Sequence, residues 1–405
     1  MAGALPFLPP AISAWPGGTV ALDEKGIAIT APDRDTKLAI GGRLHLDAGA
    51  ASLRPRLLGP ALSAPDEIRR AWLEPTLTLP GGVVANLQYD FSETPQPINN
   101  LLLAYRGREP FIITVGNFKE PFSLEQLISN NNTLFTERAL LDAFAPSRNF
   151  GAAVGAHGER WTAVAGVFGG NINTDLDRNG IAGTARLTYA PVLTDGDVVH
   201  VGVAGSYRAL DPSGTALSFD ATPEDDLFST SLVDTGTLRN AADVGRLGVE
   251  ALAQWGGARV VGEYVLTAVG GRGGLDTRLF QAGYLEAALV LNGEGPGRPY
   301  ELVPPHGSEY AVLGGVKVPD GQRLSNGGIG VFELGARVSA ISLQDGGTRG
   351  GREIDGTLGL NWYPDRDIRV MADYVHAHAD PAAHGLGDIE TADSDLFVGR
   401  LQFAW

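Results

Sequence analysis

The sequence of 405 residues has no cysteine, only two methionines and no long apolar run. Without cysteine there is no disulfide scaffold, no thiolate metal site and no cysteine nucleophile. No segment approaches the roughly 18–20 uninterrupted apolar residues of a membrane-spanning helix, which excludes a helical membrane protein. Internal repeats are also absent, and this argues against a repetitive structural or adhesive surface protein.

Basic residues are scarce relative to acidic ones. Lysine and arginine total 31 against 47 aspartates and glutamates, so the formal net charge is −16. A chain this acidic is not expected to bind nucleic acid. The net charge is a property of the whole molecule, however, and does not fix the sign of a local site.

What the sequence does contain is alternation with a period of two residues. From Leu38 to Leu46 the even positions are apolar or glycine, while Arg43 and Asp47 stand among the odd ones. The end of the chain repeats the pattern and closes on the aromatic Trp405. A strand with one dry and one wet face requires this period. A barrel can span a membrane with such strands, because only every second residue faces lipid.

Sixteen segments of this kind are separated by tight turns or polar loops. We therefore predict an all-β fold, a transmembrane antiparallel β-barrel of about 16 strands, the even number found in bacterial outer-membrane barrels. The expected strands are 37–49, 67–79, 83–91, 99–107, 110–118, 150–157, 160–168, 181–190, 198–208, 244–256, 258–269, 276–291, 328–344, 352–363, 367–378 and 395–405.

The barrel is expected to occupy 37–405, after a periplasmic N-terminal segment, 1–36, in which 20–22 and 27–29 form a small hairpin. The opening MAGALPFLPP has no basic stretch, and prolines interrupt its apolar residues, so it does not fit a secretory signal. An outer-membrane protein must be secreted. We therefore infer that this chain is a mature or trimmed form in the Gram-negative outer membrane.

Strand parity assigns the long loops to sides. With both termini in the periplasm, the loops 119–149 and 209–243 are extracellular and the segment 292–327 is periplasmic. Periplasmic turns are normally short. Either a strand at 311–318 completes the barrel differently, or this long segment has a role inside the barrel.

Charged side chains of both signs are predicted to point inward. Such charges are costly in a dry interior, so their number favours a water-filled lumen, although each could also pair across strands as a strut. The inward residues expected from alternation are Arg43, Arg70, Arg186, Arg208, Arg246, Arg337, Arg400, Asp47, Glu74, Glu250, Glu263, Glu333, Asp355 and Asp373.

The loop 119–149 is too long and too apolar to lie in solvent. Leu127, Phe135 and Phe144 are among the residues that need burial, so we expect the loop to fold into the barrel and narrow it. Ser123 and Gln126 precede this apolar run with the spacing of a capping box, which predicts one short helix.

Several stretches resemble the porin O and porin P family, the phosphate-selective porins. The matching stretches, which keep their order along the chain, are GGRLHLD at 41–47, GNFKEPFSLE at 116–125, TERALLDAFAPSRNFG at 136–151, ARLTYAP at 185–191, NGEGPGRPY at 292–300, FELGARVS at 332–339 and GTLGLNWYPDRDIRVMADYVH at 356–376.

This resemblance implies a homotrimer of 16-stranded barrels in outer-membrane lipid and lipopolysaccharide, with pores constricted by inward loops. One such loop enters from the periplasmic side, which would give 292–327 its role. It also implies passive uptake of phosphate or other small anions along basic lumen residues, which hold phosphate by arginine forks and lysine charges. The residues that we assign to pore and anion contact are Arg43, Arg69, Arg70, Lys119, Arg138, Arg148 and Arg246.

The fifth loop departs from the family pattern. Phosphate-selective members carry alternating arginines there before a proline-acid pair, whereas this chain has FDATPE at 219–224, followed by Asp225 and Asp226. This difference weakens the case for strong phosphate binding. A general porin, weakly anion-selective or even cation-preferring, is therefore the alternative.

Other motifs are weaker indications of function. The acidic and asparagine-rich stretch 173–180 resembles the start of a calcium loop, but Arg186 stands where a glutamate is required, so a turn is the better interpretation. His376, His378 and His384 are interpreted as solvated loop residues rather than metal ligands. There is no nucleophile elbow, and an outer-membrane enzyme on a barrel of about 12 strands is the remaining alternative. We expect no enzymatic activity, cofactor or metal.

Overall fold

The computed structural model describes residues 18–23, 26–54, 64–93, 95, 97–174, 180–212, 217–228, 230–274, 276–293, 297–303, 309–380 and 391–405. Sixteen antiparallel strands form a closed barrel, in which β22 pairs with β3 through Phe403 and Leu44. The predicted all-β barrel of 16 strands is thus confirmed. The barrel strands are β3 (Lys37–Arg54), β4 (Asp66–Leu79), β5 (Val83–Asp90), β6 (Ile98–Arg108), β7 (Phe111–Lys119), β8 (Arg148–His157), β9 (Trp161–Phe168), β10 (Ile181–Leu193), β11 (Asp197–Ala209), β14 (Ala241–Trp255), β15 (Ala258–Gly271), β16 (Arg278–Val290), β19 (Val331–Asp345), β20 (Thr348–Asp365), β21 (Ile368–Asp380) and β22 (Ala392–Ala404).

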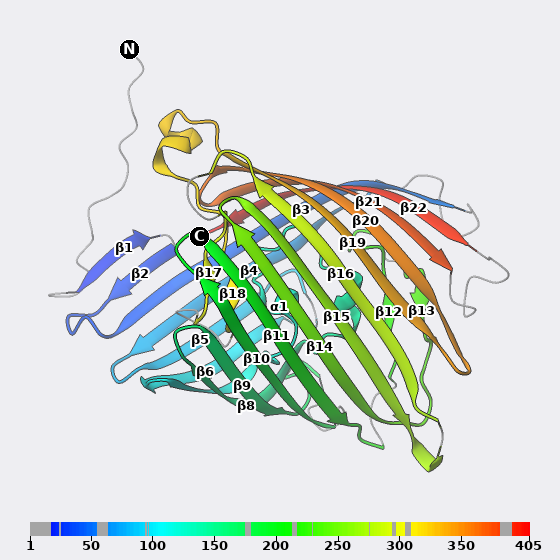
Figure 1. Cartoon of the computed structure of the whole chain (residues 1–405). Coiled ribbons are helices and arrows are strands. Elements are labelled where there is room, and N and C mark those ends of the chain that lie inside the picture. The colour runs from blue at the N-terminus through cyan, green and yellow to red at the C-terminus, as the bar shows by residue number, and fades with distance from the viewer. Residues whose placement is uncertain are drawn as a thin grey trace.

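A hairpin of β1 (Thr19–Asp23) and β2 (Gly26–Thr30) extends the sheet before the barrel begins. β2 pairs with the start of β3, where Ile27 lies opposite Ile40, and β22 pairs further along with Arg43 lying opposite Ala404. β2 and β22 therefore share one edge of β3, since β4 occupies the other. In Figure 1 the C terminus and this hairpin lie at the same end of the barrel.

The two faces of the barrel wall differ as the alternation predicts. On β20, Leu358 and Ile354 point outward and are 59% and 55% exposed, while Asp355 between them is fully buried toward the lumen. All the charged residues predicted to point inward are buried or half-buried. The apolar outer face can therefore contact lipid, and the polar inner face surrounds the lumen.

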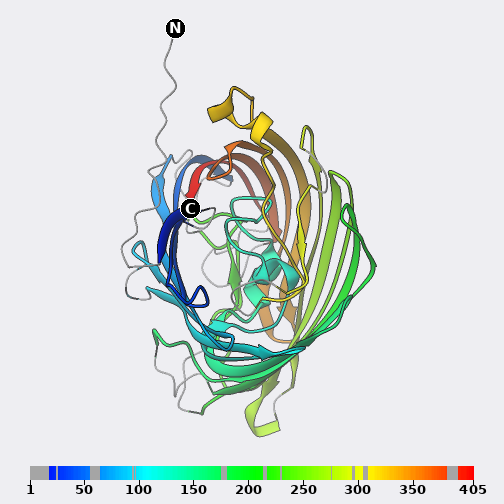
Figure 2. The same cartoon turned by 90° about the vertical axis from the view of Figure 1, so that its left-hand side faces the viewer.

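Three long segments fold into the lumen, and two of them enter from the end of the barrel opposite the C terminus. The constriction loop 120–147 carries α1 (Leu124–Leu127) and the 3₁₀ turn η2 (Leu140–Phe144). Figure 2 shows these turns within the ring of strands. The fifth loop, 210–240, carries β12 (Asp220–Ala221) and β13 (Val233–Asp234). Its Phe219 packs edge-on against Phe144 of η2, with ring centroids 5.2 Å apart.

The third segment, 291–330, enters from the opposite end. It carries β17 (Tyr300–Glu301), β18 (Val312–Leu313), η4 (Asp320–Gln322) and η5 (Leu324–Asn326). In Figure 1 the part with η4 and η5 lies at the end of the C terminus, and η3 (Arg272–Gly274) lies at the other end. β18 pairs only with β17 and does not join the barrel. The predicted alternative of a barrel strand at 311–318 is therefore wrong.

Glycines on the inner wall give the loops room to pack. A Cβ atom at Gly155 would lie 2.2 Å from the hydroxyl oxygen of Tyr310, and one at Gly359 would lie 2.9 Å from the ring of Phe135. Within the described residues, no helix combines the length and the apolar character needed to cross a membrane.

Candidate pore and its charged lining

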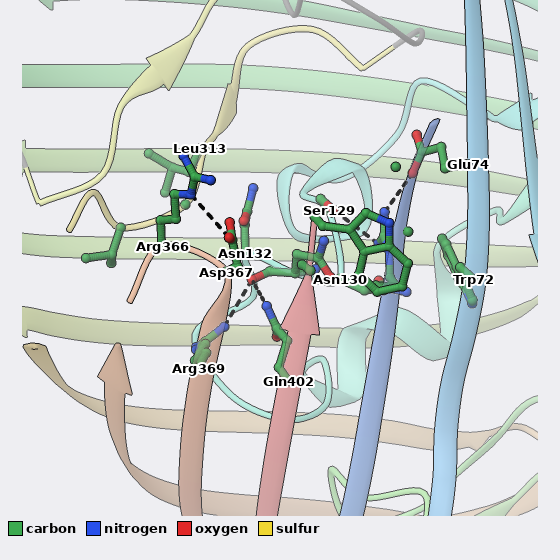
Figure 3. Close-up of a pocket in the computed structure, with 18 of the residues that line it drawn as sticks. Trp72, Glu74, Ser129, Asn130, Asn132, Leu313, Arg366, Asp367, Arg369 and Gln402 are labelled. Carbon is green, nitrogen blue, oxygen red and sulfur yellow. Dashed lines mark hydrogen bonds and ion pairs between the residues drawn. The ribbon is translucent and has the colours of Figure 1, made fainter. Parts of the chain in front are cut away.

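A cavity of about 900 Å³ lies inside the barrel. Its walls are the inner faces of β3 to β8, β21 and β22. Parts of the constriction loop and of segment 291–330 form the rest of its lining. Figure 3 shows Trp72, Glu74, Asn130, Arg369 and Gln402 around this space. The cavity extends to the β20–β21 turn and to the C-terminal residue, so it reaches the end of the barrel at which the C terminus lies.

Basic side chains outnumber acidic ones in this lining. The seven basic residues are Arg43, Lys119, Arg148, Lys317, Arg323, Arg366 and Arg369, and the five acidic residues are Glu74, Glu301, Glu309, Asp320 and Asp367. The lining thus carries a formal charge of +2, from seven minus five, in a chain whose net charge is −16. The charge of the cavity is therefore opposite in sign to that of the whole molecule. The two can differ, because ion selectivity depends on the charges that line the pore and not on the net charge of the protein.

Arg148, at the start of β8, is held by neutral amides. Its Nε donates to Oδ1 of Asn100 at 2.9 Å, and its Nη2 donates to Oε1 of Gln88 at 3.4 Å. Asn100 in turn donates to Asn86, so a chain of amides fixes the guanidinium. Among the described residues, no carboxylate lies within ion-pair distance of Arg148. Glu309 of the same lining is the acid whose charge acts on Arg148 most strongly, but the hydrogen bonds of the guanidinium go to amides, so it can also receive a solute.

Arg43 lies beside it but is partly neutralised. Its Nη2 donates to Oε2 of Glu74 at 3.0 Å, and its guanidinium lies 4.2 Å from the ring centroid of Trp72. The guanidinium of Arg148 lies 5.6 Å from the same ring. Trp72, whose indole nitrogen donates to Asp90, therefore forms a platform for both arginines.

Lys119 and Arg138 bind the constriction loop itself. The Lys119 ammonium donates to the main-chain carbonyls of residues 126–128, and Arg138 donates to the carbonyls of Glu125 and Ile128 and to the side chain of Asn130. These carbonyls belong to α1 and its end, where cations are favourable. The structure thus gives both residues a role in holding the loop.

Arg69 and Arg70 converge on Glu137 of the constriction loop. Arg69 lies 2.9 Å from Glu137 and 3.1 Å from Asp226, and Arg70 lies 3.5 Å from Glu137. Arg400 joins them at 2.9 Å. Burial raises the pKa of Glu137, but these guanidiniums outweigh it and hold the pKa well below its usual range. Glu137 is therefore ionised, and the cluster is neutralised.

Arg246 on β14 does not line the cavity. Its Nε and Nη1 atoms are buried and have no hydrogen-bond partner among the described residues. The charges that act on it are those of Glu120 and Arg208, which bond to each other at 2.6 Å. The seven sequence-predicted residues are thus not one site: Arg43, Lys119 and Arg148 line the cavity, and the other four do not.

Two arginines that were not predicted as pore residues also face the lumen. Arg369 donates to the carbonyls of Thr133 and Leu134 and lines the cavity. The alternation of inward and outward residues could have identified Arg369, because it lies on the same face of β21 as Asp373. Arg298, 1% exposed, bonds Glu333 at 2.8 Å and anchors segment 291–330. No strand pattern marks it, because it lies in a loop.

Acidic residues of the fifth loop form ion pairs with two arginines that were predicted to line the lumen. Glu224 accepts from Arg337 at 2.6 Å, and Asp226 pairs with Arg69. Ser339 and Thr357 also donate to Glu224, which is almost fully buried. Acids of the fifth loop, Glu224 and Asp226, therefore enter the lumen.

The weaker motifs lie outside the cavity. His376 and His378 are half exposed and pair with Asp395 and Asp393, and the third histidine, 384, lies outside the described residues. Most of the calcium-like stretch, 175–179, also lies outside them. In the part of the chain that is described, no three potential ligands cluster as a metal site would require.

A closed 16-stranded barrel with inward-folded loops and a polar, charged lumen defines an outer-membrane porin. The chain belongs to the family described as "Phosphate-selective porin O and P", which matches residues 38–405. Family and fold together point to a channel rather than an enzyme and place the protein in the Gram-negative outer membrane.

Individual relatives agree with this assignment. Porin O of Pseudomonas aeruginosa is 24% identical over 430 residues, which cover 96% of this chain and 93% of that protein. The anion-selective porin from Comamonas acidovorans has a TM-score of 0.54 at 10% identity and covers 91% of this chain and 100% of its own. The outer-membrane channel DcaP of Acinetobacter baumannii has a TM-score of 0.55 at 10% identity, with 93% and 99% covered. These two structural likenesses concern the fold.

Proposed function

We propose that this porin conducts small anions, phosphate among them, by passive diffusion. The observation that carries the proposal is the basic excess in the lining of the cavity, with Arg148 lacking a carboxylate partner among the described residues. An anion exchanges part of its hydration shell for donors such as Arg148 and Arg43. It leaves again because these contacts are shallow and spread over several side chains.

The test is the zero-current potential of the purified protein in a planar bilayer under a KCl gradient, repeated with phosphate added. We expect an anion-preferring potential and a reduction of the chloride current by phosphate. A potential of zero or of cationic sign would refute the proposal. The absence of any channel would contradict conduction itself.

A general porin with weak or cationic preference is the second candidate. The favouring observation is that Glu224 and Asp226 of the fifth loop neutralise Arg337 and Arg69, which leaves fewer basic groups for a solute. In the same bilayer experiment, this candidate predicts a weak or cationic potential and no effect of phosphate on the current.

We also propose a homotrimer in lipid and lipopolysaccharide. The outer face of the short strands β6 to β8 supports it, because Leu103, Phe111 and Val154 are each at least half exposed there. Such an apolar wall needs to contact lipid or another subunit. In an unheated detergent gel, a trimer should migrate as one resistant band of about three times the chain mass of 42.5 kDa. A monomer band under all conditions would refute it.

A further inference from the structure

We propose that the preferred solute of the cavity is a polyhydroxylated organic anion, that is, a sugar bearing a phosphate or carboxylate group, rather than inorganic phosphate. The inference rests on the proposed anion conduction, because it names the solute class of the same cavity. Three features of the lining carry it: the size of the space, the mixture of polar groups around it, and the guanidinium of Arg148, which is held by neutral amides.

The cavity is larger than an inorganic oxyanion requires. It holds about 900 Å³, which is near the top of the range of roughly 300–1,000 Å³ for small-molecule sites. Five heavy atoms, at about 30 Å³ each as in liquid water, fill no more than about 150 Å³. Inorganic phosphate therefore contacts one wall at a time, while a sugar phosphate can reach several walls together.

The chemistry of the lining is mixed. Five carboxylates share the space with the seven basic residues. Carboxylates repel a bare oxyanion but accept hydrogen bonds from hydroxyl groups. Seven amide side chains add both donors and acceptors: Asn86, Gln88, Asn100, Asn130, Asn131, Asn132 and Gln402. A hydroxyl group is itself both donor and acceptor, so it can use every one of these partners, whereas an oxyanion can use only the donors.

Donors also remain for a solute. The amide nitrogens of Gln88, Asn130 and Asn131 line the cavity and make no hydrogen bond within the described residues, although the oxygen atoms of all three accept one. Arg148 is fixed by Asn100 and Gln88 and offers a guanidinium for the anionic group. The anionic group at Arg148 and the hydroxyl groups toward these amides would together span the cavity.

The experiment compares three probes in a planar bilayer at pH 8, where both phosphates carry nearly two charges. Glucose 6-phosphate, inorganic phosphate and glucose are titrated against the chloride current. We expect glucose 6-phosphate to half-inhibit at a concentration about tenfold below that of phosphate, and glucose to be the weakest. Half-inhibition by phosphate at an equal or lower concentration would overturn the inference.

Variants separate recognition from simple obstruction by a larger solute. Arg148→Gln should raise the half-inhibiting concentration of both phosphates about tenfold. Gln88→Leu, which keeps the charge, should raise that of glucose 6-phosphate about threefold and leave that of phosphate unchanged. Arg108→Gln, at an exposed position near a periplasmic turn, is the control and should change neither. Inhibition by glucose 6-phosphate that is unaffected by the first two variants would refute the inference.

Two readouts keep the proposals distinguishable. If the KCl-gradient potential shows no anion preference, the proposed function fails. If that preference is present but phosphate is the stronger inhibitor, only the sugar-anion inference fails. Equal heat-modifiable gel mobility of the variants shows that each barrel has folded, so a change in inhibition reports the cavity.

Discussion

Replacing Glu137 with glutamine should make the pore more anion-selective. The carboxylate lies among Arg69, Arg70 and Arg400, and two further acids, Asp226 and Asp47, form ion pairs with these arginines. Three positive and three negative charges cancel. Glu137→Gln leaves a net charge of +1 without moving a basic residue. Asp226 is 46% exposed, so the cluster borders water and can act on a passing ion.

The magnitude follows from Coulomb's law. One charge acts on another 4 Å away with about 1 kcal/mol in water and with about 4 kcal/mol at the effective dielectric constant of a protein surface. The lower value alone favours an anion about fivefold and disfavours a cation about fivefold, so the anion-to-cation permeability ratio should rise about 30-fold. The effect should shrink in concentrated salt, because the Debye length falls from about 10 Å at 0.1 M to about 3 Å at 1 M.

The assay is the zero-current potential of wild type and Glu137→Gln at 0.1 M and 1 M mean KCl. Structural damage should be small, since glutamine keeps the Oε1 atom that accepts from Arg69 and Arg400. Glu159→Gln, exposed on a periplasmic turn, is the charge-matched control. An unchanged ratio at low salt would mean that the cluster does not act on the ion path, and the reasoning would be refuted.

Three further changes test other parts of the structure. Lys119→Met removes one of the two side chains that donate to the carbonyls of α1 and its end, while Arg138 keeps its bond to Ile128, so a loss of about 1–3 kcal/mol is expected. The constriction loop should loosen and single-channel conductance should become noisier, while equal noise would contradict the holding role of Lys119. Gly155→Val collides with Tyr310, so segment 291–330 should shift and conductance should change measurably; an unchanged conductance would contradict this packing. Asp355→Asn removes one of two buried carboxylates, Glu353 and Asp355, whose oxygens lack hydrogen-bond partners within the described residues. Two such carboxylates repel each other, so the thermal unfolding midpoint should rise, and a fall would contradict this repulsion.

The barrel was predictable because its signal is local. Alternation between wet and dry faces and the turns between strands lie within a few residues, so the strand predicted at 276–291 is observed at Arg278–Val290. Where prediction and structure differ most, the strand is longer: β20 spans Thr348–Asp365 against an expected 352–363. Parity also predicted that the segment 292–327 lies at the same end of the barrel as the termini, because twelve barrel strands precede it, and η4 and η5 are found at the end of the C terminus.

The roles of the basic residues were not predictable to the same degree. Arg400 and Glu137 lie 263 positions apart, and Arg337 and Glu224 lie 113 apart. Such pairs depend on how loops enter the lumen, and no local pattern records that. Lys119 shows the consequence: resemblance assigns it to anion contact, and the structure shows its ammonium bound to main-chain carbonyls. Its contact with a permeating anion stays a prediction.

The placement of the acids also bears on how selectivity can change within this fold. Removing an arginine such as Arg337 would strand Glu224 in a buried site, and breaking a buried pair on one side costs about 3–5 kcal/mol. Neutralising a loop acid that is half exposed, such as Asp226, strands no deeply buried charge. The cheaper route to a more basic lumen is therefore to alter loop carboxylates while the wall arginines stay. By this argument the half-exposed Asp226, rather than the buried and paired Glu224, is the loop acid whose change alters the selectivity at the lowest cost, and the barrel wall supplies a common basic background.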